Sequence, residues 1–385
     1  MKVLIAIDSF KGSLSSMEAA AAIKEGILLA SENIDVNIRP LADGGEGTAT
    51  ALTMGMQGKT EAVTVTGPLG DPVSASYGIL HKKTAIIEMA SAAGITLVPY
   101  KKRNPLHTTT FGVGEMIADA LQKGCRHFII GIGGSATNDC GVGMLQALGF
   151  RFLDQSGNTV SYGADGVRNI VSIDASLANP LLADCDFRIA CDVTNPLCGG
   201  NGCSYIYGPQ KGADPAMISQ MDAWLSAFAD LTQKIHNKKA DKNMPGAGAA
   251  GGLGFAFSAY LGGRLQSGIS IVLEETHMEA AIQDADLIIT GEGRLDSQTV
   301  MGKAPVGIAS LAKKYNKKVI AFCGCAADDA MLCNTYGIDA YFPILQKPVS
   351  LEEAMDPAVA GQNLKKNSRA GLPSSDLLCL TAFHN

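Results

Sequence analysis

"MKVLIAIDSFKGSLSSMEAAAAIKEGILLA" (residues 1–30) opens the chain with an apolar run, a polar turn and a helix-like segment. The run Val3–Asp8 predicts a buried strand, because it is too short for a signal peptide and gives way to Asp8 and Lys11. Ser15, with Glu18 three residues later, has the spacing of a capping box, so we expect a helix from about 15 to 30. A strand, turn and helix in this order are typical of α/β folds.

The same order recurs along the chain. Further strands are expected at 36–40, 127–132, 187–193, 286–290 and 319–323, and helices at about 112–123, 215–235 and 305–315. Between them, the runs 60–66, 73–80 and 84–89 are separated by Gly-Pro and Asp-Pro turns, and two of these runs alternate Thr or Ser with apolar residues. This patterning predicts an antiparallel or mixed sheet in the middle of the chain.

The strand–loop–helix order of the first sixty residues returns from about residue 265. We therefore expect a discontinuous domain made of 1–62 and 265–385, which form one open α/β sheet. Residues 63–264 would be inserted into it as a second α/β domain.

Composition narrows the possible partners and the compartment. Apolar residues make up 46% of the 385 residues, which supports a sizeable core. The net charge is −6 without any Lys/Arg-rich run, so we expect no nucleic acid partner. We expect no membrane partner either, because no apolar run reaches about 18 residues. The ten cysteines are scattered, which favours free thiols in the cytoplasm over disulfides or a zinc site.

"GIGGSATNDCGVG" (131–143) is a glycine-rich loop after an expected strand, and three interpretations compete for it. Residues 131–136 fit the G-x-G-x-x-A dinucleotide fingerprint, with Asp154 about twenty residues later. Against this, strands and a helix precede the loop, whereas the fingerprint usually follows the first strand of its domain. A Walker P-loop is excluded, because no G-x-x-x-x-G-K-[ST] occurs in the chain.

The third interpretation is a phosphate-binding loop of another kind. Backbone N–H groups of Gly133, Gly134 and Ser135 would bind oxygen anions, and the hydroxyls of Ser135 and Thr137 add donors. Asn138 and Asp139 have side chains suited to Mg²⁺ or to positioning. A tight turn whose glycines serve only packing is the alternative.

Four more polar loops follow apolar runs: "DSFKGS" (8–13), "ADGGEGT" (42–48), "CDVTNPLCG" (191–199) and "GEGRLDSQT" (291–299). Each alone fits ordinary turn chemistry. Ligands of open α/β sheets, however, gather at the carboxyl ends of strands, so five such loops together indicate a site. Their residues suit phosphoryl transfer, which needs cations for phosphates, carboxylates for Mg²⁺ and a base near the attacking hydroxyl.

Roles follow from residue type. Lys11 and Arg294 are candidates for holding a carboxylate or phosphates, and Asp192, at a strand end, is the candidate general base. Glu292 and Asp296 are spaced to hold Mg²⁺ directly or through water.

The motifs "DSFKGSLS", "PLADGGEGT", "GIGGSATND", "CDVTNPLCG", "YGPQKGA", "PGAGAAGGLG" and "TGEGRLDSQTVMGKAP" together resemble the bacterial glycerate kinase family, of the type that makes 2-phosphoglycerate. The resemblance spans about residues 1–364. It implies a flavodoxin-like domain built from both chain ends, an inserted domain, and an active site in the cleft. It also implies ATP and Mg²⁺ as cofactors and D-glycerate as the substrate, which is converted to 2-phospho-D-glycerate in organic acid catabolism.

The family's polar motif positions fall on Asp8, Lys11, Asp43, Glu46, Asp192, Glu292, Arg294 and Asp296. Of these, Asp8, Asp43 and Glu46 are expected to bind substrate. Ser91 in "EMASAAG" is expected either to reach the substrate or to cap a helix. The glycine loop falls on the expected nucleotide side, with Gly133, Gly134, Ser135, Thr137 and Asn138 as nucleotide-binding residues and Asp139 as a further metal ligand.

Two rival functions stay open at this stage. The partial fingerprint fits an NAD-dependent oxidoreductase, and the same fold could serve a non-enzymatic sugar-acid sensor, although no basic recognition helix is visible. A monomer or a homodimer fits equally well. The segment "SRAGLPSSDLLCLTAFHN" (368–385) departs from the family pattern, so we expect an atypical, poorly packed tail in which Leu377 and Phe383 are not buried.

Overall fold

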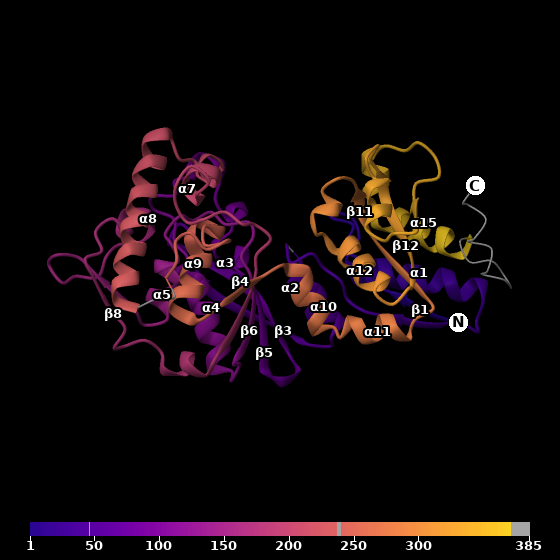
Figure 1. Ribbon diagram of the computed structural model, residues 1–385, viewed down its shortest axis with the longest axis horizontal. Helices are drawn as coiled ribbons and strands as arrows, with labels where there is room; N and C mark the ends of the chain where they lie inside the picture. The colour runs from indigo at the N-terminus through magenta and orange to yellow at the C-terminus, as the bar shows by residue number, and fades with distance from the viewer. Residues whose placement is uncertain (46, 237–239, 371–385) are drawn as a thin grey trace. The chain divides into compact units, whose positions relative to one another are not determined.

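The computed structural model describes residues 1–45, 47–236 and 240–370 (Figure 1). It forms two compact units, one from Met1–Asp43, Met54–Met56 and the chain from Val272 onward, the other from Gly44–Thr53 and Gln57–Ile271. The chain changes unit at 43/44, 53/54, 56/57 and 271/272; helix α2 (Thr48–Gly55) contains the second of these boundaries and helix α10 (Gly268–Glu275) the last. The expected boundary at residue 62 falls inside strand β3 (Lys59–Thr66), which belongs to the second unit.

A five-stranded parallel sheet forms the centre of the first unit. Its order is β13-β12-β11-β1-β2, and its strands are β1 (Lys2–Ile5), β2 (Asp35–Ile38), β11 (Leu287–Leu295), β12 (Lys318–Ala326) and β13 (Ala340–Pro343). β1 pairs with both β2 and β11. Numbered along this unit, the order is 2-1-3-4-5, which is the flavodoxin-like arrangement and confirms the predicted fold class.

Helices cover both faces of this sheet. On one face, α1 (Ser16–Ala30) and α15 (Pro357–Ala370) pack together (Figure 1). They cover apolar side chains of β1 and β11. α11 (Met278–Asp284) contacts β1, and α12 (Ala304–Lys313) contacts β11 and β12. The predicted capping box of α1 is confirmed, since the Glu18 N–H donates to Ser15 Oγ at 3.3 Å and the Ser15 N–H donates to Glu18 Oε2 at 2.9 Å. The shorter helices are α13 (Leu332–Thr335) and α14 (Leu351–Met355).

The second unit is built on a six-stranded mixed sheet, as the sequence predicted. Its order is β10-β9-β6-β5-β4-β3, with β4 (Pro72–Leu80), β5 (Thr84–Glu88), β6 (His127–Gly131), β9 (Asp186–Ala190) and β10 (Arg264–Gln266) beside β3. β3, β4 and β5 are antiparallel, whereas β5, β6, β9 and β10 run parallel. The parallel strands therefore send the loops that follow them to one edge of the sheet.

Helices and a small hairpin complete the second unit. The helices are α3 (Ala90–Ala93), α4 (Phe111–Gln122), α5 (Val142–Ala147), α6 (Gly163–Val167), α7 (Cys203–Tyr207), α8 (Pro215–His236) and α9 (Ala249–Leu261). β7 (Arg151–Leu153) and β8 (Ser172–Asp174) form a separate antiparallel pair.

The small-residue stretch 245–252 has a direct structural reason. Gly251 has a φ of +67°, and a Cβ at this position would lie 2.1 Å from the carbonyl oxygen of Thr137. The N–H of Cys140 donates to the Gly251 carbonyl at 2.9 Å. The start of α9 therefore packs backbone to backbone against the loop after β6 and fixes its course.

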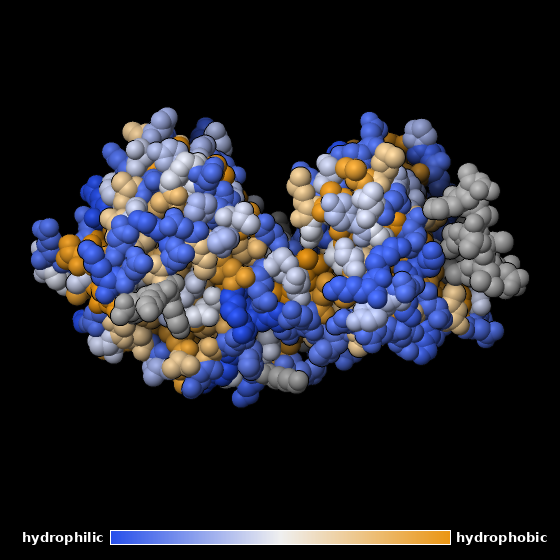
Figure 2. Space-filling view, viewed as in Figure 1, coloured by the Kyte–Doolittle hydropathy of each residue, from blue (hydrophilic) through white to orange (hydrophobic). Residues whose placement is uncertain are grey.

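The C-terminal expectation needs one correction. Ser368, expected to begin the atypical tail, belongs to the last turn of α15, where it is buried and its Oγ donates to the Leu364 carbonyl at 2.8 Å. Leu377 and Phe383 lie outside the described residues. On the face shown in Figure 2, both units carry hydrophilic side chains with apolar ones interspersed. None of the helices in the described ranges is long and apolar enough to span a bilayer.

Candidate functional site

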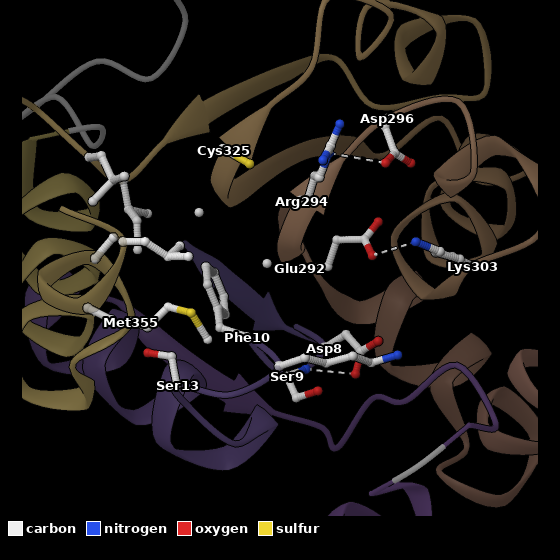
Figure 3. Close-up of a pocket in the computed structure, with 18 of the residues that line it drawn as sticks. Asp8, Ser9, Phe10, Ser13, Glu292, Arg294, Asp296, Lys303, Cys325 and Met355 are labelled. Atoms are coloured by element: carbon white, nitrogen blue, oxygen red, sulfur yellow. Dashed lines mark hydrogen bonds and ion pairs between the residues drawn. The ribbon is translucent and has the colours of Figure 1, made fainter. Parts of the chain in front are cut away.

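The polar loops of the first unit meet where β1 and β11 end. These two strands are neighbours in the sheet at the point where the strand order reverses, which is where open α/β sheets bind ligands. The Asp8 N–H donates to the Gly291 carbonyl at 2.9 Å, so the pairing continues beyond β1 and brings Asp8 beside Glu292. A pocket of about 610 Å³ opens here (Figure 3), a size in the usual range of small-molecule sites.

Asp8 is the most perturbed carboxyl group of this pocket. It is only 5% exposed, and one of its oxygens accepts a hydrogen bond from the Ser9 N–H at 2.7 Å. Burial, and then the nearby carboxylate of Asp43, raise the pKa of Asp8 to about 7. A carboxyl group in this state gains and loses its proton near neutral pH, as a general base must.

Glu292 is held by two residues that the sequence reasoning did not assign. The Thr299 hydroxyl donates to Glu292 Oε1 at 2.6 Å, and the Lys303 ammonium lies 3.6 Å from Oε2 (Figure 3). Burial raises the pKa of Glu292 despite these partners. Both residues belong to the motif "TGEGRLDSQTVMGKAP", which was the available signal.

Two cationic side chains at the pocket, Lys11 and Arg294, form ion pairs with carboxylates. Lys11 Nζ lies 3.2 Å from Asp43 Oδ2, and Arg294 Nε lies 3.3 Å from Asp296 Oδ2. The side chains of Lys11 and Arg294 are 64% and 65% exposed, so their charged ends can also reach an anionic ligand. Glu46, predicted for the same site, lies outside the described residues.

The opposite wall of this pocket is apolar. Phe10 and Met355 line it with Ile344, Leu345 and Leu351 (Figure 3). The pocket thus joins a charged side, made by the strand ends, to an apolar side, which suits a small acidic molecule more than a large apolar one.

In the second unit, the loop after β6 presents free backbone donors. Gly133 and Gly134 are exposed, and a Cβ at Gly133 would meet open space. Within the part of the chain that the structure describes, the N–H groups of Gly133, Gly134 and Ser135 donate to no acceptor. Gly134 has a φ of +72°, and successive N–H groups in such a turn form a concavity that binds anions.

The end of this loop points inward. Thr137, Asn138 and Asp139 have 0% exposure, and Asn138 Nδ2 donates to Ser204 Oγ at 3.0 Å. Asp139 accepts hydrogen bonds from the N–H and hydroxyl of Thr110 at 2.8 Å, and from the N–H groups of Gly141 and Gly143 at 3.2 and 3.3 Å. The hydrogen bonds of Asn138 and Asp139 hold the loop in shape, whereas Thr137 Oγ1 is buried without a hydrogen-bond partner among the described residues. The predicted ligand contacts of Thr137 and Asn138 and the predicted metal role of Asp139 stay predictions, and the structure places all three side chains behind the exposed part of the loop.

Asp192 and Ser91 lie at the same edge of the second sheet as the glycine loop, because they follow β9 and β5, the parallel neighbours of β6. Asp192 is exposed, and its Oδ1 accepts a hydrogen bond from the N–H of Gly268 at 3.0 Å. Ser91 lies in α3, and the carbonyl of Ala93 at the end of this helix accepts from the Ala136 N–H at 2.9 Å.

Asp154, the acidic residue on which the dinucleotide-binding interpretation depended, is engaged in a turn. Asp154 Oδ1 accepts from the N–H groups of Ser156 and Asn158, both at 2.9 Å, in the exposed turn after β7. It therefore shapes a turn. No group of three or more His, Cys, Asp or Glu side chains is arranged to hold a metal ion among the residues described here.

The comparisons with known proteins agree with one another. A model of the glycerate kinase family matches residues 3–370. Glycerate 2-kinase of Escherichia coli K12 is 50% identical over 92% of this chain and 93% of its own length. Glycerate kinase of Bacillus subtilis 168 is 48% identical over 93% and 94%. A crystal structure assigned as glycerate kinase 2 of Salmonella typhimurium LT2 superposes with a TM-score of 0.89 at 45% identity, covering 96% of this chain and 97% of the other.

Proposed function

The chain belongs to the glycerate kinase family and is a kinase, and on that premise we propose that it phosphorylates D-glycerate with ATP to give 2-phospho-D-glycerate. The observation that carries the proposal is the pocket at the ends of β1 and β11. It combines two exposed cations, Lys11 and Arg294, with the buried carboxyl groups of Asp8 and Glu292. Such a set suits a small hydroxy acid, because the cations bind its carboxylate and the acidic groups accept from its hydroxyls.

We assign the nucleotide to the second unit. The free N–H groups of Gly133, Gly134 and Ser135 suit the oxygens of a triphosphate. The buried Asn138, whose Nδ2 donates to Ser204 Oγ, supports the loop from behind. Ser91, on the neighbouring loop, stays a candidate for a ligand contact.

Two carboxyl groups are candidates for accepting the proton of the attacking hydroxyl. The sequence favoured Asp192, whose exposed carboxylate accepts from Gly268. Asp8 is supported more strongly, because it lines the pocket, is buried, and has its pKa raised to about 7. A base whose pKa lies near the working pH is unprotonated in a large fraction of the molecules and still accepts a proton favourably. We therefore propose Asp8 as the proton acceptor and Asp192 as a residue that orients a substrate.

The carboxylate oxygens at this pocket are the type of ligand that Mg²⁺ prefers. Glu292 and Asp296 provide carboxylate oxygens, and Mg²⁺ needs only one or two of these when phosphate oxygens and water complete its shell. We propose these two residues as its protein ligands. When bound, the ion would neutralise charge on the phosphates. Lys303 and Thr299, both bound to Glu292, keep that carboxylate oriented.

Calorimetry and turnover together test the proposal. The protein should bind ATP with Mg²⁺ and release ADP only when D-glycerate is present. Tight binding of NADH without such turnover would favour an oxidoreductase. Binding of glycerate with no ATP turnover would favour a sensor, and either result would overturn the kinase assignment.

A further inference from the structure

Lys211 lies buried behind the glycine loop, in the motif "YGPQKGA" (207–213), and the roles above leave it unassigned. It ends the short 3-10 helix Pro209–Lys211 and is only 2% exposed. Its ammonium donates to Ser135 Oγ at 2.9 Å and to the Thr137 carbonyl at 2.6 Å. No carboxylate in the described part of the chain forms an ion pair with it. A buried lysine that has only neutral partners is uncommon and costs free energy.

The surroundings of Lys211 leave its charge uncompensated. The titratable groups that face it are the thiol of Cys203 and the carboxyl of Asp139. Asp139 is already engaged by Thr110, Gly141 and Gly143, and burial lowers the pKa of Lys211 to about 8. An ammonium has three N–H donors, and the described residues provide acceptors for two of them. The site therefore has a positive charge that no described carboxylate pairs with, and one N–H donor without an acceptor among the described residues.

The contact with Ser135 determines where its hydroxyl proton points. Because Ser135 Oγ accepts from Lys211, its own O–H must donate in another direction. Ser135 is 7% exposed and directly follows the exposed Gly133 and Gly134. Three free backbone N–H groups, one hydroxyl and one ammonium therefore converge at the same turn, and all of them favour an anion.

We propose that Lys211 is the positioning residue of a polyphosphate-binding loop. By holding Ser135 Oγ and the Thr137 carbonyl, it aims the donors of 133–135 at one phosphate group, and that phosphate compensates its buried charge. This inference rests on the proposed function and deepens it, because it names the group on which the nucleotide site depends. The ligand class is a nucleoside triphosphate or another linear polyphosphate.

Inorganic tripolyphosphate is the probe, because it carries the phosphate chain without the base. Its affinity is measured by calorimetry for the wild type, Lys211→Met, Ser135→Ala, the double variant and Lys242→Met. Lys242 is the matched control, since it is a half-buried lysine of the same unit whose charge is paired with Asp230 and which also donates to Ser226. Lys211→Met should weaken binding about 10- to 100-fold, as loss of a charge-assisted hydrogen bond does. Lys242→Met should stay within about twofold, as surface ion pairs contribute little.

Two readouts separate positioning from mere structural support. Combining Ser135→Ala with Lys211→Met should weaken binding little more than Lys211→Met alone, because the two residues act as one unit. At pH 8, binding should take up more protons in the wild type than in Lys211→Met, since burial lowers the pKa of Lys211 to about 8 and a bound phosphate favours the charged amine. Comparing buffers of different ionisation enthalpy gives the proton uptake of each protein, and the variant accounts for the protons that tripolyphosphate itself exchanges. With ATP, the variant's KM should rise for ATP and not for glycerate.

Three results would overturn the inference: unchanged tripolyphosphate affinity in Lys211→Met, fully additive losses in the double variant, or equal proton uptake by the wild type and Lys211→Met. If Lys211→Met does not fold, Ser135→Ala decides the matter, because unchanged tripolyphosphate affinity in that variant would also overturn the inference. Failure of the proposed function looks different, because the wild type would then show no glycerate-dependent ATP turnover. Normal glycerate-dependent ATP turnover in the wild type, together with unchanged tripolyphosphate affinity in Lys211→Met, would overturn only the role proposed for Lys211.

Discussion

Replacing Asp8 with Asn should stabilise the protein at pH 8 and inactivate it. Asp8 is buried beside Asp43, and its pKa is raised from 3.8 to about 7 in the folded protein. The folded state therefore resists ionisation that the unfolded chain accepts. Ionisation of Asp8 therefore lowers the unfolding free energy of the wild type by a growing amount as the pH rises from about 4 to about 7. A shift of about 3 pKa units corresponds to about 4 kcal/mol when the group is fully ionised.

Urea unfolding at pH 4 and pH 8 measures this effect. Asn is nearly isosteric with Asp and does not titrate, so Asp8→Asn should gain about 4 kcal/mol in unfolding free energy over the wild type between pH 4 and pH 8. Ser13→Ala, a non-titrating change in the same pocket, should shift stability equally at both pH values. Glycerate-dependent ATP turnover of Asp8→Asn should fall by about 100-fold or more, as loss of a general base does. A stability difference that does not grow with pH, or near-normal turnover, would refute the reasoning.

Three further changes test the remaining assignments. Lys11→Met should raise the KM for glycerate by about tenfold with little change in the KM for ATP, because it removes one carboxylate-binding cation; an effect confined to ATP would contradict this. Asp192→Asn should lower kcat by less than Asp8→Asn and leave an ionisation near pH 7 in the pH–rate profile; loss of that ionisation would return the base role to Asp192. Thr299→Val removes the hydroxyl that donates to Glu292 and should raise the Mg²⁺ concentration needed for half-maximal turnover by about tenfold, whereas an unchanged requirement would exclude Glu292 as a ligand.

Local patterns predicted the elements well. The Ser15–Glu18 capping box forms as expected, because the two residues lie one helical turn apart and need no distant partner. The return of the strand–helix order late in the chain predicted one open sheet from both chain ends, and in that sheet β11 pairs with β1 across about 280 residues. The loops after β1 and β11 therefore meet, and Asp8, Glu292, Arg294 and Asp296 line one pocket.

Side-chain direction was beyond sequence reasoning. Thr137, Asn138 and Asp139 have suitable chemistry for a nucleotide loop, yet all three are buried. The start of α9 packs against Thr137 and Asn138, and Asp139 is surrounded by donors of Thr110, Gly141 and Gly143. Lys211 contacts Ser135 from 76 residues away in the sequence, so spacing alone does not connect them. Asp154 matched a spacing rule while serving a turn. Residue type and spacing thus indicated which loops form the site, whereas burial decides which side chains face it.

The most direct test of glycerate phosphorylation is phosphorus NMR of a reaction with ATP, Mg²⁺ and D-glycerate. We expect the γ-phosphate signal to decline as one new phosphomonoester signal appears, coupled to the single proton on C2 as in 2-phospho-D-glycerate. A signal coupled to the two protons on C3 would contradict the assigned hydroxyl. Release of inorganic phosphate alone, or no change in ATP, would contradict glycerate phosphorylation itself.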